Sequence, residues 1–454
     1  MVIDLLVAEI GSTTTVLNAF DKLDKAPSFI GQGQGKTTVD TGNVLDGIYE
    51  AMKALEKNIG EKIEYRDFIA TSSAAGGLKM TVHGLVHDMT VKAAKEAALG
   101  AGANLKFLTS GKLRRTDLKK ITEIRPNIIL IAGGVDYGER ETALDNAEAI
   151  RSLNLSIPVI YAGNIENREE IREIFKDTKV DLFITENVYP AIDSLNVEPA
   201  RAVIQEVFEK HIIHAPGMEK VREMVSGTIM PTPGAVIEAA KLLYEDIGDL
   251  MVIDVGGATT DVHSVCEDSE KYSLMMLNPE PKAKRTVEGD LGMYVSRQNV
   301  YDLMDKEELS AKFGKSEEEM NQFVENLPPI PTDKEEIKLV EELCKAATKT
   351  AVERHTGYLR VIFGVKGKKT YAVGKDLTNV RWIIGTGGAL TKLPGRENLL
   401  SSIFSLKKDF LLPNREAALL YDNDYIMASL GCMSKRYPDA ALKLLKKSLG
   451  LKRR

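Results

Sequence analysis

The chain has 454 residues, more than one hydrophobic core ordinarily organises, so two or three domains are expected. Hydrophobic residues make up 43% and charged residues 28% of the chain, a balance typical of water-soluble globular proteins. The net charge of −6 argues against binding to nucleic acid or to an anionic membrane, and no stretch approaches the ~20 apolar residues of a membrane span.

The first quarter of the chain is predicted to open with a β-hairpin, followed by a third strand and a helix. Val44, Ile48 and Leu55 recur at helical spacing in the segment that follows the third strand. The expected elements are strands at residues 4–10, 15–20, 29–35 and 68–72, and helices at 41–58 and 90–100.

Strands and helices alternate in the next part of the chain. Strands are expected at 127–132, 158–162 and 181–185, and helices at 140–153, 167–175 and 200–213. Such alternation predicts parallel strands with helices packed on the faces of the sheet.

The second half is predicted to begin near residue 235, after a segment that contains Pro231 and Pro233. It should contain a helix at 236–245, a hairpin at 250–262, a charged helical insertion and connector at 307–338, a helix at 336–354, a strand at 381–384, and closing helices at 424–436 and 440–449.

Cysteine usage and the N-terminal residues indicate a cytoplasmic protein. Cys266, Cys344 and Cys432 are odd in number and far apart, without a metal-binding spacing, so reduced thiols are expected. The first apolar run has no basic region before it and has the pattern of a strand, not of a signal peptide.

Two hairpins, one at the start of each half, have the same design. Each combines an apolar strand, an acid near its end, a turn of glycine and hydroxyl residues, and a second apolar strand. The first turn contains Glu9, Gly11, Ser12, Thr13 and Thr14; the second contains Asp254, Gly256, Gly257, Ala258, Thr259 and Asp261. Backbone N–H groups and hydroxyls in such turns suit phosphate oxygens, and the acids suit a hydrated divalent cation. Two facing hairpins would therefore clamp the phosphates of a nucleotide.

A third glycine turn follows the strand that contains Trp382. Gly385, Gly387 and Gly388 lie where this buried strand is expected to break and a short helix to begin. Glycine permits close approach of the backbone to a ligand, and the start of a helix offers free N–H groups to an anion. For one such turn alone, a simple strand-to-helix connection is the favoured interpretation.

Together, the three turns resemble those of the sugar kinase, heat-shock protein 70 and actin superfamily of ATPases. The resemblance implies an α/β fold of two lobes, each a ribonuclease H-like mixed sheet flanked by helices (the actin-like ATPase fold). The first lobe would comprise residues 1–234, with a βα insertion around 127–215. The second would comprise 235–454, with a helical insertion around 300–335. ATP and Mg²⁺ would lie in the cleft, with the three glycine turns as the nucleotide site.

The resemblance also implies roles for the two acids. Asp254 would hold Mg²⁺ through water, and Glu9 would orient water or the metal, so both are candidate catalytic and metal-binding residues. The superfamily usually has aspartate at the position of Glu9. The extra methylene displaces the charge, so either slow hydrolysis or binding without turnover is expected.

Motifs spread over nearly the whole length resemble the glutamate mutase MutL family, also called GlmL. They are LLVAEIGSTTT (5–15), TSSAAGGLKM (71–80), IAGGVDYGER (131–140), VIDVGGATTDVHS (252–264), VEGDLGM (287–293), IIGTGGALT (383–391) and DNDYIMASLG (422–431). Members of this family resemble ATPases that accompany adenosylcobalamin-dependent mutases and aminomutases of amino-acid fermentation. The resemblance implies an accessory protein that uses ATP to release damaged cobalamin from a mutase partner, by analogy with diol dehydratase reactivating factors.

Two other functions stay open at this stage. A small-molecule kinase would need a polar pocket for an acceptor, which the sequence does not display. A nucleotide-binding pseudo-ATPase scaffold is favoured by Glu9.

Two further motifs are set aside. The segment GQGQGKTT (31–38) has Ile30 where a P-loop needs its first glycine, and a strand end with a loop is expected there. His83 and His87 have helical spacing, but Gly84 stands where a zinc protease needs glutamate.

Overall fold

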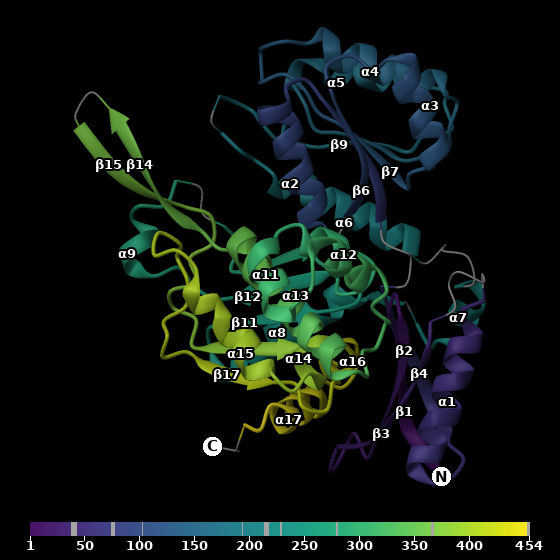
Figure 1. Ribbon diagram of the computed structural model, residues 1–454. Helices are drawn as coiled ribbons and strands as arrows, with labels where there is room; N and C mark the ends of the chain where they lie inside the picture. Colours follow the sequence, from purple (N-terminus) through teal and green to yellow (C-terminus); the bar gives the residue numbers. More distant parts are fainter. Residues whose placement is uncertain are drawn as a thin grey trace. The chain divides into compact units, whose positions relative to one another are not determined.

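The computed structural model describes residues 1–37, 43–73, 78–101, 103–192, 194–212, 218–227, 229–277, 280–364 and 367–451 (Figure 1). It divides into two compact units. Unit 1 comprises Met1–Gly76, Ile212–Thr286 and Leu291–Arg454, and unit 2 comprises Gly77–His211 and Val287–Asp290. Residues 74–77 of the TSSAAGGLKM motif lie outside the described residues.

The first sheet of unit 1 has five strands in the order β10-β4-β1-β2-β3. Its strands are β1 (Val2–Ile10), β2 (Thr14–Asp21), β3 (Ser28–Lys36), β4 (Glu64–Ser72) and β10 (Met230–Pro231). The pairs β1–β2 and β2–β3 are antiparallel, whereas β1–β4 and β4–β10 are parallel. Helix α1 (Leu45–Ile59) packs its apolar stripe, including Ile48 and Leu55, on this sheet. It begins at Leu45, later than the predicted residue 41, which lies outside the described residues together with residue 42.

The second sheet repeats the connectivity of the first, in the order β13-β12-β11-β16-β17. Its strands are β11 (Leu250–Val255), β12 (Thr260–Val265), β13 (Ala283–Glu288), β16 (Trp382–Thr386) and β17 (Ala418–Tyr421). Strands β11 and β12 are antiparallel, and β16 is parallel to both β11 and β17. In both sheets the first strand of a hairpin lies at the centre, next to a parallel strand that comes later in the chain. This is the ribonuclease H-like order, so the predicted α/β fold with two such sheets, the actin-like ATPase fold, is confirmed.

Helices α8 (Thr232–Ile247), α16 (Met427–Met433) and α17 (Pro438–Ser448) share one hydrophobic core with both sheets. Leu5 and Val7 of β1 enter this core from the first sheet, and Leu250 and Val252 of β11 enter it from the second. The core therefore couples the two hairpin strands, β1 and β11, that carry the predicted acids.

The crossing of α8 and α16 requires a glycine at residue 431. A Cβ atom at this position would overlap the carbonyl oxygen of Ala235 on α8. Gly431→Ala should therefore lower the free energy of unfolding by about 1–3 kcal/mol, because the helices must separate. Gly234→Ala on α8 is the matched control, since its Cβ would lie 3.3 Å from the end of the flexible Arg285 side chain and 3.8 Å from its next neighbours, Met230 and Pro231. Chemical denaturation measures both; equal stabilities would contradict the packing at Gly431.

Most of the remaining helices of unit 1 cover the other face of the second sheet. Their core joins Leu339, Leu343 and Ala347 of the long helix α13 to Ile253 of β11 and Ile383 of β16. These helices are α7 (Glu219–Met224), α9 (Glu270–Ser273), α10 (Arg297–Tyr301), α11 (Lys306–Phe313), α12 (Glu317–Glu325), α13 (Lys334–His355), α14 (Gly387–Lys392) and α15 (Arg396–Ser401), of which α7 packs with the first sheet and α9 is a short surface turn. Asp333 caps α13 and Ser316 caps α12, each with a glutamate three residues later that completes a capping box.

Unit 2 contains a fully parallel sheet in the order β6-β5-β7-β8-β9. Its strands are β5 (Leu78–Gly84), β6 (Ala103–Ser110), β7 (Ile128–Ile131), β8 (Val159–Tyr161) and β9 (Leu182–Ile184), and its helices are α2 (Lys92–Gly100), α3 (Arg115–Ile124), α4 (Glu141–Ser152), α5 (Arg168–Phe175) and α6 (Glu198–Ile212). Separate cores cover its two faces. The predicted alternation from residue 127 is present, but the sheet also includes β5 and β6, which come earlier in the chain.

His83 and His87 have the sequence spacing of one helical turn but do not share a helix. His83 lies in β5, is fully buried, and its ring nitrogens are 2.8 Å from Thr109 Oγ1 and 3.0 Å from Thr81 Oγ1. Burial lowers the pKa of His83 to about 3, so the ring is neutral.

A two-stranded hairpin of β14 (Tyr358–Gly364) and β15 (Gly367–Val373) completes unit 1. In the part of the chain that the structure describes, no helix is both long and apolar enough to cross a membrane.

Candidate nucleotide site

The first glycine turn joins β1 to β2 through one tight hydrogen bond. The backbone N–H of Gly11 donates to the carbonyl of Thr14 at 2.9 Å. A Cβ atom on Gly11 would lie 2.7 Å from the same carbonyl oxygen, so the turn requires glycine. The Ser12 hydroxyl donates to the carbonyl of Ser73 at 3.0 Å, which ties the turn to the end of β4.

The second glycine turn repeats this geometry between β11 and β12. The N–H of Gly256 donates to the carbonyl of Thr259 at 2.9 Å, the counterpart of the bond from Gly11 to Thr14. The carbonyls of Gly256 and Gly257 accept the N–H groups of Met293 and Tyr294 at 3.1 and 2.8 Å. The second turn is therefore held by the segment that follows β13, as the first is held by the end of β4.

The three glycine turns meet. A Cβ atom on Gly257 would lie 2.8 Å from Thr13 Oγ1, so the tip of the second turn contacts the side chain of the first. Gly387 has a φ of +83°, and a Cβ atom there would overlap the Asp254 carboxylate and the backbone of Val255. The chain can pass this close to Asp254 only at a glycine.

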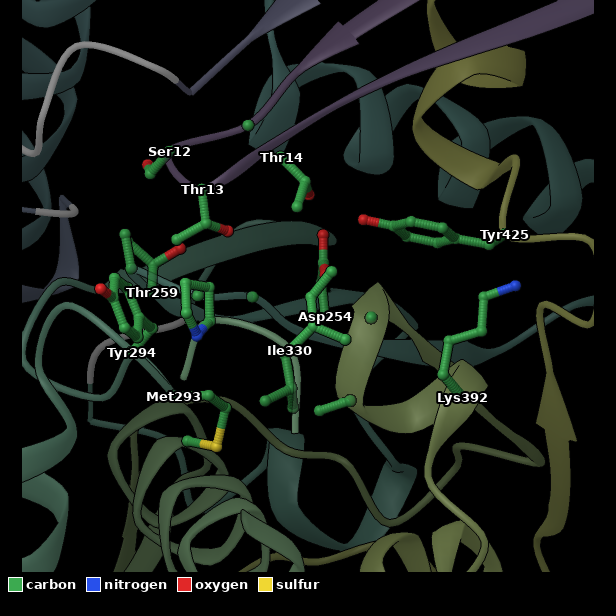
Figure 2. A pocket seen from close by; sticks show the side chains of 18 of the residues that line it. Ser12, Thr13, Thr14, Asp254, Thr259, Met293, Tyr294, Ile330, Lys392 and Tyr425 are labelled. Atoms are coloured by element: carbon green, nitrogen blue, oxygen red, sulfur yellow. The ribbon is translucent and has the colours of Figure 1, made fainter. Parts of the chain in front are cut away.

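A cavity of about 350 Å³ lies where the turns meet, within the size range of small-molecule sites. One end is lined by the turns and the acids, and the other by apolar side chains. The polar lining includes Glu9, Gly11, Ser12, Thr13, Thr14, Asp254, Gly256, Gly257, Thr259 and Asp261; the apolar lining includes Met293, Pro329, Ile330, Pro331, Ile337, Val340 and Leu393. In Figure 2, Thr13 and Thr14 extend toward Asp254 from the first turn, and Tyr425 extends toward it from another side.

The structure brings most of the predicted site residues to this cavity. Ala258 and Gly388 line it together with the polar residues above. Two predicted residues do not line it. Gly385 remains inside β16, where it pairs with Ile253, and Gly387 packs against Asp254. The strand thus continues to Thr386 and does not break at Gly385 as predicted.

Three carboxylates, those of Glu9, Asp254 and Asp422, cluster near the polar end; Glu9 and Asp422 are buried, and Asp254 is partly exposed to the cavity. Burial, together with the nearby charges of Asp254 and Asp422, raises the pKa of Glu9 to about 8. Burial and the charge of Asp422 likewise raise the pKa of Asp254 to about 7. Glu9 accepts a long hydrogen bond of 3.4 Å from Ser429. Among the described residues, no lysine or arginine forms an ion pair with these acids.

Asp422 differs from the other two acids because it is fully hydrogen-bonded. It accepts bonds from the Thr386 and Ser448 hydroxyls and from the backbone N–H groups of Ile426 and Met427, at 2.6–3.0 Å. It joins the end of β16 to the start of α16 and is a structural acid.

The donor set fits a hard divalent cation. Glu9 and Asp254 present carboxylate oxygens at the two glycine turns, and the repulsion between them would be relieved by a cation. No three metal-ligating side chains within the described ranges converge closely enough to hold a metal alone. Magnesium commonly binds through one or two carboxylates, with water and substrate phosphates completing its shell, and this site matches that pattern.

The pKa values of these acids predict a pH dependence of stability. In the folded state Glu9 and Asp254 bind protons up to about pH 8 and 7, whereas in the unfolded state they release them near 4.5 and 3.8. The folded state therefore binds more protons in this window, and the nucleotide-free protein should lose stability as the pH rises from 5 to 8. Thermal melts should show a falling Tm that flattens in the double variant Glu9→Gln/Asp254→Asn. A pH-independent Tm of the wild-type protein would contradict the raised pKa values.

Tyr425 is a lining residue that sequence reasoning missed. It adopts a left-handed φ of +52°, and Gln32 donates to its carbonyl at 3.2 Å. Gln32 also donates to Asn18, which donates to Ser429, so one chain of hydrogen bonds links Tyr425 to the partner of Glu9. Burial and the three carboxylates raise the pKa of Tyr425, so it is a neutral hydrogen-bond donor at the cavity. The DNDY sequence at 422–425 was the only visible clue.

The apolar end was also missed. The sequence predicts a connector at Pro329, Ile330 and Pro331, but these residues line the cavity together with Ile337 and Val340 of α13. The apolar surface that these residues form suits a planar apolar group such as a nucleobase.

Two comparisons with known proteins identify relatives. The family described as "MutL protein" matches residues 5–449. Protein MutL of Clostridium tetanomorphum is 36% identical over 459 residues, which cover 98% of each chain.

Solved structures give weaker likenesses. The nucleotide-free diol dehydratase-reactivating factor has 11% identity and a TM-score of 0.38, with 96% of this chain and 100% of that chain covered. Component A of (R)-2-hydroxyglutaryl-CoA dehydratase from Acidaminococcus fermentans has 11% identity and a TM-score of 0.32, with 97% and 99% covered. Likenesses of this size support no conclusion about function.

Proposed function

The chain belongs to the MutL protein family, and from this membership and its site we propose that it is an ATP-binding accessory protein that reactivates an adenosylcobalamin-dependent amino-acid mutase or aminomutase. The observation that carries the nucleotide part is the meeting of two matched glycine turns, with Glu9 and Asp254 at the polar end of one cavity. The mutase partner rests on the family resemblance.

ATP with Mg²⁺ is the proposed ligand of this cavity. The N–H groups and hydroxyls of the two turns would hold the phosphates, and the apolar end would hold the base. Bound Mg²⁺ would supply charge neutralisation at the phosphates. Asp254 would position its hydration shell. Glu9, once deprotonated, would orient the attacking water and accept its proton.

The two-lobe division at residues 234 and 235, with insertions around 127–215 and 300–335, is part of the proposal. The shared core of α8 and α16 supports coupling between the lobes, because it contacts β1 and β11 directly. Closure of the lobes on ATP would be the movement passed to the mutase. We place this activity in the cytoplasm, with no role for nucleic acid or a membrane.

A second candidate is a pseudo-ATPase scaffold, and Glu9 is the observation that favours it. Its side chain is one methylene longer than the aspartate usual in the superfamily. Its raised pKa of about 8 leaves it largely protonated near neutral pH when no cation is bound. Such an acid is a poor base until the cation lowers its pKa.

Single-turnover hydrolysis of ATP, with and without an adenosylcobalamin-dependent mutase, tests the proposal. Release of phosphate that the inactivated mutase stimulates would support reactivation. Tight binding with no phosphate release in either condition would support the scaffold. Transfer of phosphate to a metabolite would contradict both and indicate a kinase.

A further inference from the structure

The β14–β15 hairpin, here called the arm, is anchored only at its base. Leu359 donates its N–H to the carbonyl of Asp409 at 2.9 Å, and Ala372 donates its N–H to the carbonyl of Met275 at 2.9 Å. These bonds cover both edges of the hairpin at its base, where it leaves the rest of unit 1. In Figure 1, β14 and β15 project beyond the other strands and helices of that unit.

The edge of β14 is open beyond this base. In an antiparallel pair, the N–H and C=O of alternate residues point away from the partner strand. Since Leu359 donates outward to Asp409, Val361 and Phe363 also direct their backbone groups outward. Among the described residues, neither forms a backbone hydrogen bond to another segment on that side.

The side chains of this edge are apolar and exposed. Phe363 is 79% exposed, and Val361 and Ile362 are each more than a third exposed. An isolated two-stranded hairpin is marginally stable in water, and an open apolar edge is prone to pairing with another strand. The arm therefore has the properties of a strand that is completed by a partner.

The charges of the arm distinguish its two edges. Residues 360–371 contain one arginine and three lysines and no acid, within a chain of net charge −6. Lys368 and Lys369 lie on β15, where lysine discourages edge pairing. The stretch from Val361 to Phe363 on β14 carries no charge. Only the β14 edge is thus suited to receive a strand.

We propose that the β14 edge pairs with the β14 edge of a second copy of this chain. A two-fold axis at Ile362 places Val361 of each copy opposite Phe363 of the other copy. This register matches the outward backbone groups of Val361 and Phe363, so four hydrogen bonds complete a four-stranded sheet.

The same register matches the side chains. Phe363 lies beside Val361 of the other copy on one face, and the two Ile362 side chains meet on the other face, which are favourable cross-strand pairs. Arg360 lies opposite Gly364, and the lysines stay on the outer strands, so no like charges face each other across the new pair. The contact is small, so the dimer is expected to be weak and concentration-dependent.

Cross-linking of the full-length protein tests this register. The Cβ atoms of Ile362 in the two copies would be about 4.5–5.5 Å apart, close enough for a disulfide with a small adjustment. Ile362→Cys should form an intermolecular disulfide under mild oxidation. The three native cysteines are buried and should stay unreactive. Leu274→Cys is the control, because Leu274 is 91% exposed and apolar but lies outside the arm.

Sedimentation velocity supplies the second test. Val361→Pro removes one outward N–H, and Phe363→Asp places a charge in the pairing, so each should weaken dimerisation at least about ten-fold. Leu274→Asp should leave it unchanged, and thermal melts confirm folding of each variant. A wild-type protein that stays monomeric at about 100 μM, or equal cross-linking of the Ile362→Cys and Leu274→Cys variants, would overturn the proposal. So would a monomer whose arm binds polyglutamate, which would indicate an acidic partner.

Discussion

Asp254→Ala is expected to weaken the binding of ATP–Mg²⁺ by about 100-fold, measured by isothermal titration calorimetry at pH 8. Asp254 is the penultimate residue of β11, beside the Gly256 turn, and lines the cavity at the point where Gly387 passes. Without it, one of the two carboxylates that would hold the hydrated cation is lost. Binding of ATP in the presence of EDTA should change much less, because the two turns are proposed to contact the phosphates directly.

This loss should not result from unfolding. Burial raises the pKa of Asp254 to about 7, so its charge at pH 8 is unfavourable in the folded state, and alanine should not lower the Tm. Asp24→Ala is the matched control, since Asp24 is exposed and lies outside the cavity. If Asp254→Ala bound ATP–Mg²⁺ as well as the wild-type protein, the nucleotide site proposed here would be wrong.

The sequence was sufficient to predict the two hairpins because their determinants are local. An apolar strand, a Gly-x-x-Thr turn and a second strand are encoded within a dozen residues, and in both hairpins the glycine N–H closes on the threonine carbonyl. The alternation of strands and helices similarly predicted a parallel sheet. Both features depend on residues that are neighbours along the chain.

The rest of the site depends on residues that are far apart along the chain. Asp422 and Tyr425 directly precede α16, which packs on α8 at Gly431, and no local pattern encodes that crossing. The proline segment at 329–331 has the composition of a connector and lines the cavity because α13 holds its far end. The predicted end of the strand at Gly385 was wrong because the sequence does not distinguish a glycine inside a strand from a glycine that ends one.

The arm was missed because its stability does not follow from its own pattern. Residues 358–363 include residue types that are common in strands. A strand is recognised most readily, however, when one of its faces is apolar and the other is polar. Both faces of the arm carry apolar and basic residues, including Phe363 and Lys368, because it has no core to cover within its own unit.

When ATP–Mg²⁺ binds at pH 7, the Glu9→Gln variant is expected to release about one proton fewer than the wild-type protein. The pKa of Glu9 is raised to about 8, so the cation-free protein holds a proton there at pH 7, and a bound cation would displace it. Glutamine keeps the shape but has no proton to release. Calorimetric titration in buffers of different ionisation enthalpy counts the protons directly.

The same variant separates hydrolysis from binding. Glu9→Gln should bind ATP–Mg²⁺ within a few-fold of the wild-type protein, because Asp254 and both turns are intact. Any hydrolysis should fall by about 10²–10⁴-fold, the range for loss of a general base. Glu64→Gln, exposed at the start of β4, is the control for the loss of one charge. Unchanged proton release in Glu9→Gln would show that Glu9 does not meet the cation, and a full rate of hydrolysis would assign the base to another residue.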